Sequence, residues 1–190
     1  MRTIITSLKA IFILTILTGI VYPVLMIIVS HFIFPQRASG SLITINGEII
    51  GSEIISQKFQ SEKYFWSRPS AIDYNPLPSG ASNLGPTSRS LQKIVEQRKT
   101  FFTEKNFLSS NVALPTEMVF SSGSGIDPHI SPEAALLQVQ RIALAHGFDE
   151  VKVNKLRSMI QKMAEPLQFG FLGQPRINVL LLNIELDKIR

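Results

Sequence analysis

The run from Ala10 to Phe34 carries no charged residue and constrains this chain more than any other feature. About 20 apolar residues in a helix cross a hydrocarbon core of roughly 30 Å, and this run is longer than that. Gly19 and Pro23 would be costly inside a soluble helix, but membrane helices tolerate both residues. The run therefore predicts one transmembrane helix over residues 10–34, between a short N-terminus (residues 1–9) and a single larger domain (residues 35–190).

A cleaved signal peptide is the alternative interpretation of the run. The apolar part of a signal peptide is usually about 7–15 residues long, which is shorter than this segment. The small residues Ala38–Gly40 resemble a cleavage site, but Pro35 and Arg37 come just before them. A retained membrane anchor is therefore favoured.

Positive charges near the run predict its orientation. Arg2 and Lys9 precede it, and only Arg37 follows closely. Because basic residues stay on the cytoplasmic side, residues 1–9 are expected in the cytoplasm and the domain outside it.

Polar residues inside the run have two interpretations. The hydroxyls of Thr15, Thr18 and Ser30 can bond to carbonyls of their own helix. Alternatively, Thr15 and Gly19 can form a small-residue face that contacts a partner helix. No acidic or basic residue lies in the middle of the run, so this helix alone is not expected to form an ion path.

The rest of the chain predicts an α+β fold, with helices and strands mixed in one domain. Asn46–Gly47 between β-branched runs predicts a hairpin, extended weakly over residues 53–55. Residues 60–88 are rich in proline, glycine and aromatic residues, which is typical of a long loop that is functional or packed against the domain. The other predicted elements are a helix opening at Pro86, a strand at Met118–Phe120, a helix through Ala134–Ala145 capped by Ser131, a helix capped by Asp149, and a central strand over Ile177–Leu186.

Several kinds of chemistry are excluded or unsupported by the composition. The chain has no cysteine, which removes disulfides, thiolate catalysis and cysteine-based metal sites. The net charge of +5 is spread over the sequence without a basic stripe, so a nucleic-acid partner is not expected. Neither a P-loop nor a Gly-x-Gly-x-x-Gly segment occurs. We therefore expect no metal site, no catalytic residues and no cofactor of the chain's own.

Two clusters of small polar residues remain as candidate sites. The first runs from Ser122 to Ser131, where a Gly-rich loop enters a helix N-terminus and Asp127 and His129 add ionisable groups. The alternative is a simple turn, in which Asp127 bonds to its own backbone and Pro128 fixes the bend. The second cluster is Pro78–Gly85, which can cradle a phosphate or serve as an ordinary turn.

Four blocks in fixed order follow the N-terminal run. The blocks are Tyr64–Ser70, Ser79–Gly80 with Ser82–Pro86, Ser122–Pro132, and Gly173–Leu180 with Leu182–Asn183. With these blocks, the chain resembles the C subunit of the bacterial Kdp potassium-transporting P-type ATPase over nearly its full length. One departure is Ala81, which stands where that family is expected to have a glycine.

The resemblance implies an accessory role in the bacterial inner membrane, with a periplasmic domain. The implied partners are a channel-like potassium-binding subunit, an ATP-hydrolysing subunit and membrane lipid, with potassium as the cargo. The family's C subunit is described as a catalytic chaperone that raises ATP affinity, and ATP is the one ligand it implies. The residues linked to that nucleotide are Ser79, Gly80, Ser82 and Asn83.

We further expect the loop with Gly123, Gly125, Asp127 and His129 to dock on a partner. Gly123 and Gly125 are expected to adopt backbone angles closed to other residues. Because an unperturbed histidine changes charge between about pH 5 and 8, a contact through His129 is expected to depend on pH. The alternative function is a membrane-anchored extracytoplasmic hydrolase or ligand-binding domain, for which no nucleophile, base and orienting group can be assembled from the sequence.

Overall fold

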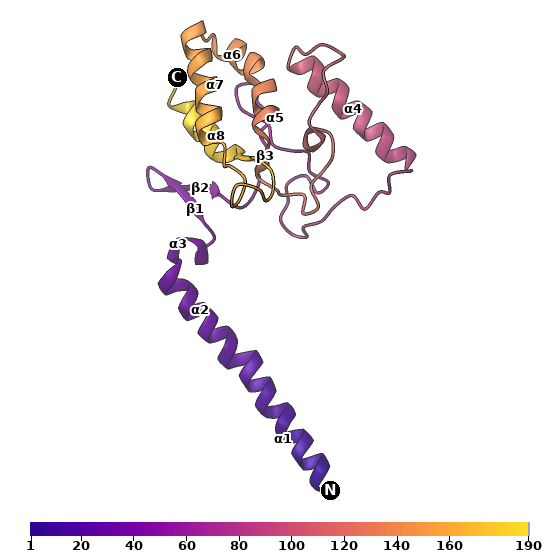
Figure 1. Ribbon diagram of the computed structural model, residues 1–190, viewed down its shortest axis with the longest axis vertical. Coiled ribbons are helices and arrows are strands. Elements are labelled where there is room, and N and C mark those ends of the chain that lie inside the picture. Colours follow the sequence, from indigo (N-terminus) through magenta and orange to yellow (C-terminus); the bar gives the residue numbers. More distant parts are fainter. Residues whose placement is uncertain (190) are drawn as a thin grey trace. The chain divides into compact units, whose positions relative to one another are not determined.

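The computed structural model describes residues 1–189 and divides into two compact units. The first unit runs from Met1 to Ser52, and the second begins at Glu53. The first contains the apolar helix and a hairpin, and the second contains the mixed helices and short strands (Figure 1). This architecture confirms the predicted fold class: one N-terminal apolar helix followed by a small α/β domain.

The apolar helix consists of α1 (Arg2–Ile16), the π-helical turn η1 (Leu17–Val21) and α2 (Tyr22–Ile33). Together they form one helix of 32 residues that is long and apolar enough to cross a membrane. This helix begins at Arg2, whereas the predicted span begins at Ala10. Two of the polar side chains bond to their own helix as expected: Thr18 donates to the Leu14 carbonyl (2.7 Å) and Ser30 to the Met26 carbonyl (2.6 Å).

Pro23 explains the π-helical turn. Proline has no backbone N–H, so it cannot donate to the carbonyl of Gly19 one turn earlier, and its ring crowds that carbonyl. The helix widens locally, and the Tyr22 N–H donates to the Leu17 carbonyl instead. Such single wide turns are a common way for a helix to absorb this kind of disruption.

A hairpin follows the helix in the first unit. The short helix α3 (Pro35–Ala38) leads into β1 (Leu42–Ile45) and β2 (Glu48–Ser52), which pair antiparallel. Asn46 (φ 53°) and Gly47 (φ 85°) both have positive φ, as tight hairpin turns require. The predicted hairpin is confirmed, but residues 53–55 form a turn and do not extend it.

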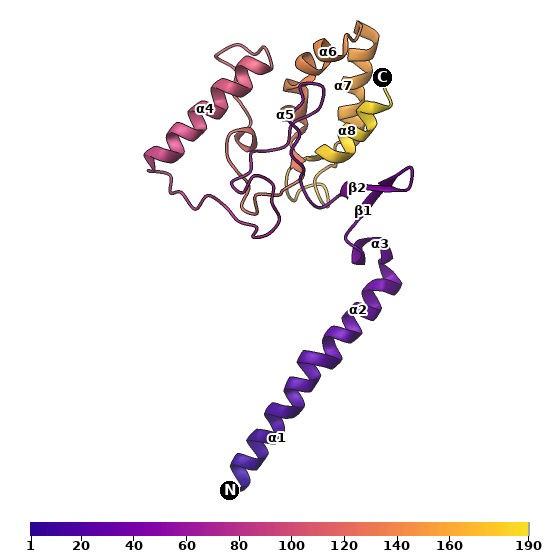
Figure 2. The ribbon, with the colours of Figure 1, turned by 180° about the vertical axis from the view of Figure 1, so that it is seen from behind.

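The second unit is mainly helical. Its elements are α4 (Arg89–Lys105), η2 (Thr116–Met118), β3 (His129–Ile130), α5 (Pro132–Leu137), α6 (Val139–His146), α7 (Glu150–Met163), β4 (Ile177–Asn178) and α8 (Val179–Asp187). Helix α7 packs against α5, α6 and α8. These four helices lie together in both views, while α4 lies on the other side of the domain (Figure 2).

Side-chain caps begin the helices much as the sequence predicts. Ser131 accepts a hydrogen bond from Ala134 N (3.1 Å), and Asp149 accepts one from Lys152 N (2.8 Å). The helix expected from Pro86 begins later, at Arg89, where Ser88 is the cap. The helix expected through Ala134–Ala145 is divided into α5 and α6 at Gln138.

Two predicted strands are wrong. Ile177–Leu186 is not a central strand, because only Ile177 and Asn178 are extended and a buried helix follows. The Asn178 side chain starts that helix by accepting hydrogen bonds from Leu180 N and Leu181 N. A short apolar run of this kind fits a buried strand and a buried helix equally well. Met118–Phe120 is likewise not a strand, since Thr116–Met118 forms a 3-10 turn.

The aromatic block near Tyr64 is fixed in the core by side-chain amides. Asn183 accepts from Phe65 N (2.8 Å) and donates to Phe65 O (3.0 Å). Likewise, Gln138 accepts a hydrogen bond from Trp66 N (2.7 Å) and donates one to Trp66 O (3.3 Å). Each amide satisfies both polar groups of a buried backbone unit, as a neighbouring strand would. The expectation that this loop packs against the domain is confirmed.

Arg141 completes this arrangement from inside the core. Its guanidinium lies 3.8 Å from the centre of the Trp66 ring and donates to Asn106 Oδ1 (3.0 Å), Tyr64 O (3.0 Å) and Gln138 Oε1 (2.8 Å). It also donates to Glu62 O. Burial lowers the pKa of Arg141 to about 10, so the side chain stays charged at neutral pH.

Candidate functional site

The structure brings the two predicted polar loops into contact. Gly80 N donates to Ser124 O at 3.0 Å. Gly125 has φ +74°, and a Cβ there would lie 2.8 Å from Gly80 O and 2.6 Å from an Ile72 side-chain carbon. Only glycine fits this close approach, so the backbone freedom expected of Gly125 is confirmed.

Gly123 differs from Gly125. Its φ is outside the positive range, and a Cβ there would meet no atom within 4 Å. The expectation that Gly123 adopts angles closed to other residues is therefore wrong. The loop bends over residues 123–125; Gly125 has the positive φ, and Gly123 is an exposed position at the start of the bend.

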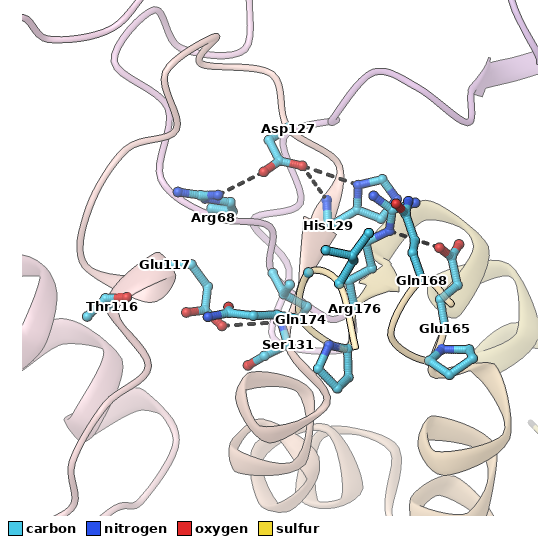
Figure 3. Close-up of a pocket in the computed structure, with 15 residues that line it drawn as sticks. Arg68, Thr116, Glu117, Asp127, His129, Ser131, Glu165, Gln168, Gln174 and Arg176 are labelled. Carbon is cyan, nitrogen blue, oxygen red and sulfur yellow. Dashed lines mark hydrogen bonds and ion pairs between the residues drawn. The ribbon is translucent and has the colours of Figure 1, made fainter. Parts of the chain in front are cut away.

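Asp127 is the polar centre of the loop (Figure 3). One carboxylate oxygen forms an ion pair with Arg68 Nη1 (2.8 Å), and the other accepts from His129 N (3.0 Å) and lies 3.3 Å from His129 Nδ1. Burial alone would raise the pKa of Asp127, but the bonds from His129 and the charge of Arg68 outweigh it and lower that pKa below its usual value. Asp127 therefore braces the loop as an ionised acceptor.

A cavity of about 510 Å³ opens beside this centre. Asp127, His129 and Arg68 line one part of it, and the pair Glu165–Arg176 (2.9 Å) lines another. Glu117 also lines the cavity and accepts a hydrogen bond from Ser131 N (3.2 Å). The remaining lining residues are Thr116, Ile130, Ser131, Pro166, Gln168, Leu172, Gly173, Gln174 and Pro175.

Most charged side chains of this cavity are paired with one another. Arg68 and Arg176 are each paired with a carboxylate, so the lining is nearly balanced. The Ser131 hydroxyl, which is the hydroxyl nearest to His129 in the sequence, caps α5, and His129 is held by Asp127 rather than by a nucleophile. Within residues 1–189, no three His, Cys, Asp or Glu side chains gather as metal ligands. The cavity therefore offers a polar contact surface.

The residues linked to nucleotide lie apart from this cavity. Ser79, Ser82 and Asn83 are exposed, and Asn83 has a positive φ of 52°. Ser82 lines a smaller cavity of about 360 Å³ beside Leu84 and Arg98. Gly80 N is already bonded to Ser124, so one backbone amide of this cluster is unavailable to a phosphate.

The predicted helix-contact residues lie on the apolar helix. Thr15 and Gly19 are both exposed, and a Cβ at Gly19 would meet no atom within 4 Å. In the described part of the chain, the Thr15 hydroxyl makes no side-chain hydrogen bond, unlike that of Thr18. Another helix can therefore approach closely here.

Sequence reasoning missed Arg68, Glu165 and Arg176 as members of the site. Arg68 lies 59 residues from Asp127 in the chain, so no local pattern joins them. Glu165 and Arg176 are paired by backbone as well as side chains (Glu165 N to Arg176 O, 2.8 Å). The sequence signal that could have joined them is the set of turn-forming residues between them, which predicts a chain reversal. These residues are Pro166, Gly170, Gly173 and Pro175.

The fold defines a class: a small α/β domain that follows one N-terminal helix long and apolar enough to cross a membrane. The comparisons with known proteins agree. Residues 4–188 match the family described as KdpC, the K+-transporting ATPase c chain. The chain therefore belongs to the KdpC family and is a subunit of the Kdp potassium-transporting ATPase, rather than its catalytic component.

Individual relatives match over almost their whole length. The potassium-transporting ATPase KdpC subunit of Leptospira interrogans is 44% identical over 181 residues, covering 95% of this chain and 91% of the relative. The subunit of Geotalea uraniireducens is 44% identical over 179 residues, covering 92% of each. That of Synechocystis is 41% identical over 195 residues, covering 98% of each. The family resemblance seen in the sequence is confirmed.

Proposed function

We propose that this chain is a non-catalytic subunit that assembles the high-affinity potassium uptake complex and raises the ATP affinity of its ATP-hydrolysing subunit. Full-length similarity to subunits of a potassium-transporting ATPase is the observation that carries this proposal. The Asp127 site supports a non-catalytic role for the chain. The Asp127 carboxylate contacts Arg68 and the His129 imidazole, and neither Asp127 nor His129 contacts a nucleophile. Potassium is the cargo of the complex, and the chain needs no cofactor of its own.

The chain lies in the bacterial inner membrane with its domain in the periplasm. Arg2 and Lys9 support this orientation because they precede the apolar helix centre. In that arrangement, Ser79–Asn83 faces away from cytoplasmic ATP. The bond from Gly80 N to Ser124 O also counts against a phosphate cradle at this cluster. The effect on ATP affinity therefore passes through the partner subunits, as a bias between two conformations.

The loop Gly123–His129 is the docking element in this proposal. Its backbone is fixed by Gly125 against Gly80 and by Asp127 against Arg68. The His129 side chain remains about a quarter exposed at the edge of the cavity. A preformed loop of this kind loses little conformational freedom on binding, which favours its use as a contact surface for a partner subunit.

The test is His129→Ala in the whole complex. We expect potassium-stimulated ATPase activity to fall while the melting temperature of the chain is unchanged, because the loop backbone is held by other contacts. His146→Ala is the matched control: this histidine bonds to Lys63 O (2.9 Å) outside the cavity lining. Lower melting temperature with activity restored on cooling would reduce the role of His129 to stability.

A further inference from the structure

A second cavity, of about 450 Å³, lies along α4 in the second unit. Helix α4 lies on the other side of the domain from α5–α8 (Figure 2). None of the residues that line this cavity also lines the cavity beside Asp127, and none belongs to the cluster Ser79–Asn83. Its size falls in the range of small-molecule sites, about 300–1,000 Å³. The cavity along α4 is therefore separate from both sites predicted from the sequence.

Aromatic rings form much of the wall of this cavity. The rings belong to Phe59, Trp66, Tyr74, Phe101 and Phe102. Trp66 and Phe101 are stacked, with ring centroids 5.3 Å apart and 20° between the ring planes. Phe101 is nevertheless 54% exposed, so a large apolar surface remains open to water. A flat apolar group that covers Phe101 gains both from burial and from the geometry of ring contacts.

Most polar donors of the wall are used within the chain itself. The hydroxyls of Tyr74 and Ser67 and the indole N–H of Trp66 all donate to backbone carbonyls, at 2.8, 3.1 and 3.0 Å. The Lys58 ammonium forms an ion pair with Asp73 (2.5 Å). These groups shape the wall, but their main bonds are already made.

Arg98 is the lining cation that no carboxylate neutralises within residues 1–189. Its Nη1 donates to Val119 O (3.1 Å), and it takes part in none of the ion pairs of the described chain. Burial lowers the pKa of Arg98, because removal from water disfavours its charge, and an anion beside it would offset that cost. The remaining N–H groups of a guanidinium form a planar fork that matches a carboxylate.

The charge of the lining selects among ligands. Lys58 and Arg98 are its charged residues, and no acidic side chain belongs to it. In the cavity beside Asp127, by contrast, Arg68 and Arg176 both have carboxylate partners. The cavity along α4 therefore disfavours amines and favours an anion.

We propose that this cavity binds a small aromatic carboxylate, with its ring against Phe101 and its carboxylate on the free N–H groups of Arg98. A ring is favoured over an alkyl chain because the wall is itself built of rings. One carboxylate is favoured over a polyphosphate because Arg98 is the one lining cation without an acidic partner in the described chain. This binding is independent of the effect on ATP affinity and of the Asp127 loop.

The test uses para-trifluoromethyl phenylacetate as the probe and its neutral amide as the matched analogue. Fluorine NMR measures the dissociation constant of each compound for the full chain in detergent, with empty micelles as the blank, and then for the assembled complex. Arg98→Gln removes the charge, and Phe101→Ala removes the exposed ring. Arg89→Gln is the control, because Arg89 is an exposed arginine of α4 outside the cavity lining. Melting temperatures show whether each variant is folded.

We expect the carboxylate to bind the wild type and Arg89→Gln equally, in the free chain and in the complex. The amide should bind about tenfold more weakly or worse, and Arg98→Gln should weaken the carboxylate by a similar factor, because each change removes a charged hydrogen bond. Phe101→Ala should weaken both compounds alike, which keeps the test decisive if Arg98→Gln does not fold.

Three results would overturn the proposal. The first is no binding of the carboxylate beyond the micelle blank. The second is equal binding of the carboxylate and the amide, or equal effects of Arg89→Gln and Arg98→Gln, since the Arg98 charge would then select nothing. The third is binding to the free chain but not to the complex, because a partner subunit would then fill the cavity in place of a small molecule.

Discussion

Two blocks that are equally recognisable in the sequence behave differently in the structure. The block Tyr64–Ser70 enters the core, where Gln138, Arg141 and Asn183 bind its backbone. The block Ser79–Pro86 is mostly exposed, with the bond from Gly80 N to Ser124 O as its link to the loop beyond. The fold explains why Phe65, Trp66 and Ser67 of the first block are buried, whereas it leaves most side chains of the second block exposed.

The largest expected effect comes from removing Arg141. Arg141→Ala removes the buried hydrogen bonds to Asn106 Oδ1, Gln138 Oε1 and Tyr64 O, and we expect the free energy of unfolding to fall by about 3 kcal/mol or more. Denaturant unfolding of the full chain in detergent, followed by fluorescence of the single tryptophan, measures this change. Arg141→Lys keeps the positive charge but lacks the planar guanidinium with its several donors, so this variant should recover only part of the lost stability. A neutral Arg141→Ala would contradict the structural role of the first block.

Asn183→Leu should have the next largest effect. The substitution keeps the volume but leaves both the N–H and the carbonyl of Phe65 unpaired in the core, at a cost of about 2 kcal/mol. The same unfolding experiment applies. Asn154→Leu, on the exposed side of α7, is the control and should change stability by less than about 0.5 kcal/mol. Equal effects of the two substitutions would show that the amide is dispensable.

Gly125→Ala tests the one place where the two polar loops approach closely. The new Cβ must be accommodated at positive φ against Gly80 O, so we expect a loss of about 1–3 kcal/mol. Gly123→Ala is a matched control in the same loop, where space is open, and should be nearly neutral. Thermal melting compares the two variants. A neutral Gly125→Ala would mean that the loops separate without cost.

The Asp127 centre should give a smaller, pH-dependent effect. The pKa of Asp127 is lower in the folded chain than in the unfolded chain, so its stabilisation is complete above about pH 4 and is lost as the pH falls below that value. Melting temperatures from pH 7 to pH 3 should therefore fall less steeply for Asp127→Asn than for the wild type. Asp73→Asn, which removes the exposed ion pair with Lys58, should leave the slope close to that of the wild type.

Local patterns in the sequence predicted the elements that depend on neighbouring residues. The uncharged run, Asn46–Gly47 and the caps Ser131 and Asp149 all specify structure within a few residues, and each is present. The strand predicted over Ile177–Leu186 was wrong, because a short apolar run fits a buried helix and a buried strand equally well.

The candidate site was predicted only in part, for a similar reason. Asp127 and His129 are close in sequence, so their association was foreseeable. The pairing of Asp127 with Arg68, and the contact of Gly125 with Gly80, join segments that only the folded chain brings together. The cavity they border could therefore not be predicted from spacing.

The most direct test of the central claim is the KM for ATP of the complex assembled with and without this chain, measured beside the purified chain alone. The account predicts no ATP turnover by the chain, because no phosphate-binding lysine loop occurs in its sequence. It also predicts a lower KM for ATP when the chain is present in the complex. ATP turnover by the chain alone, or a KM that does not change when the chain is left out, would contradict the account.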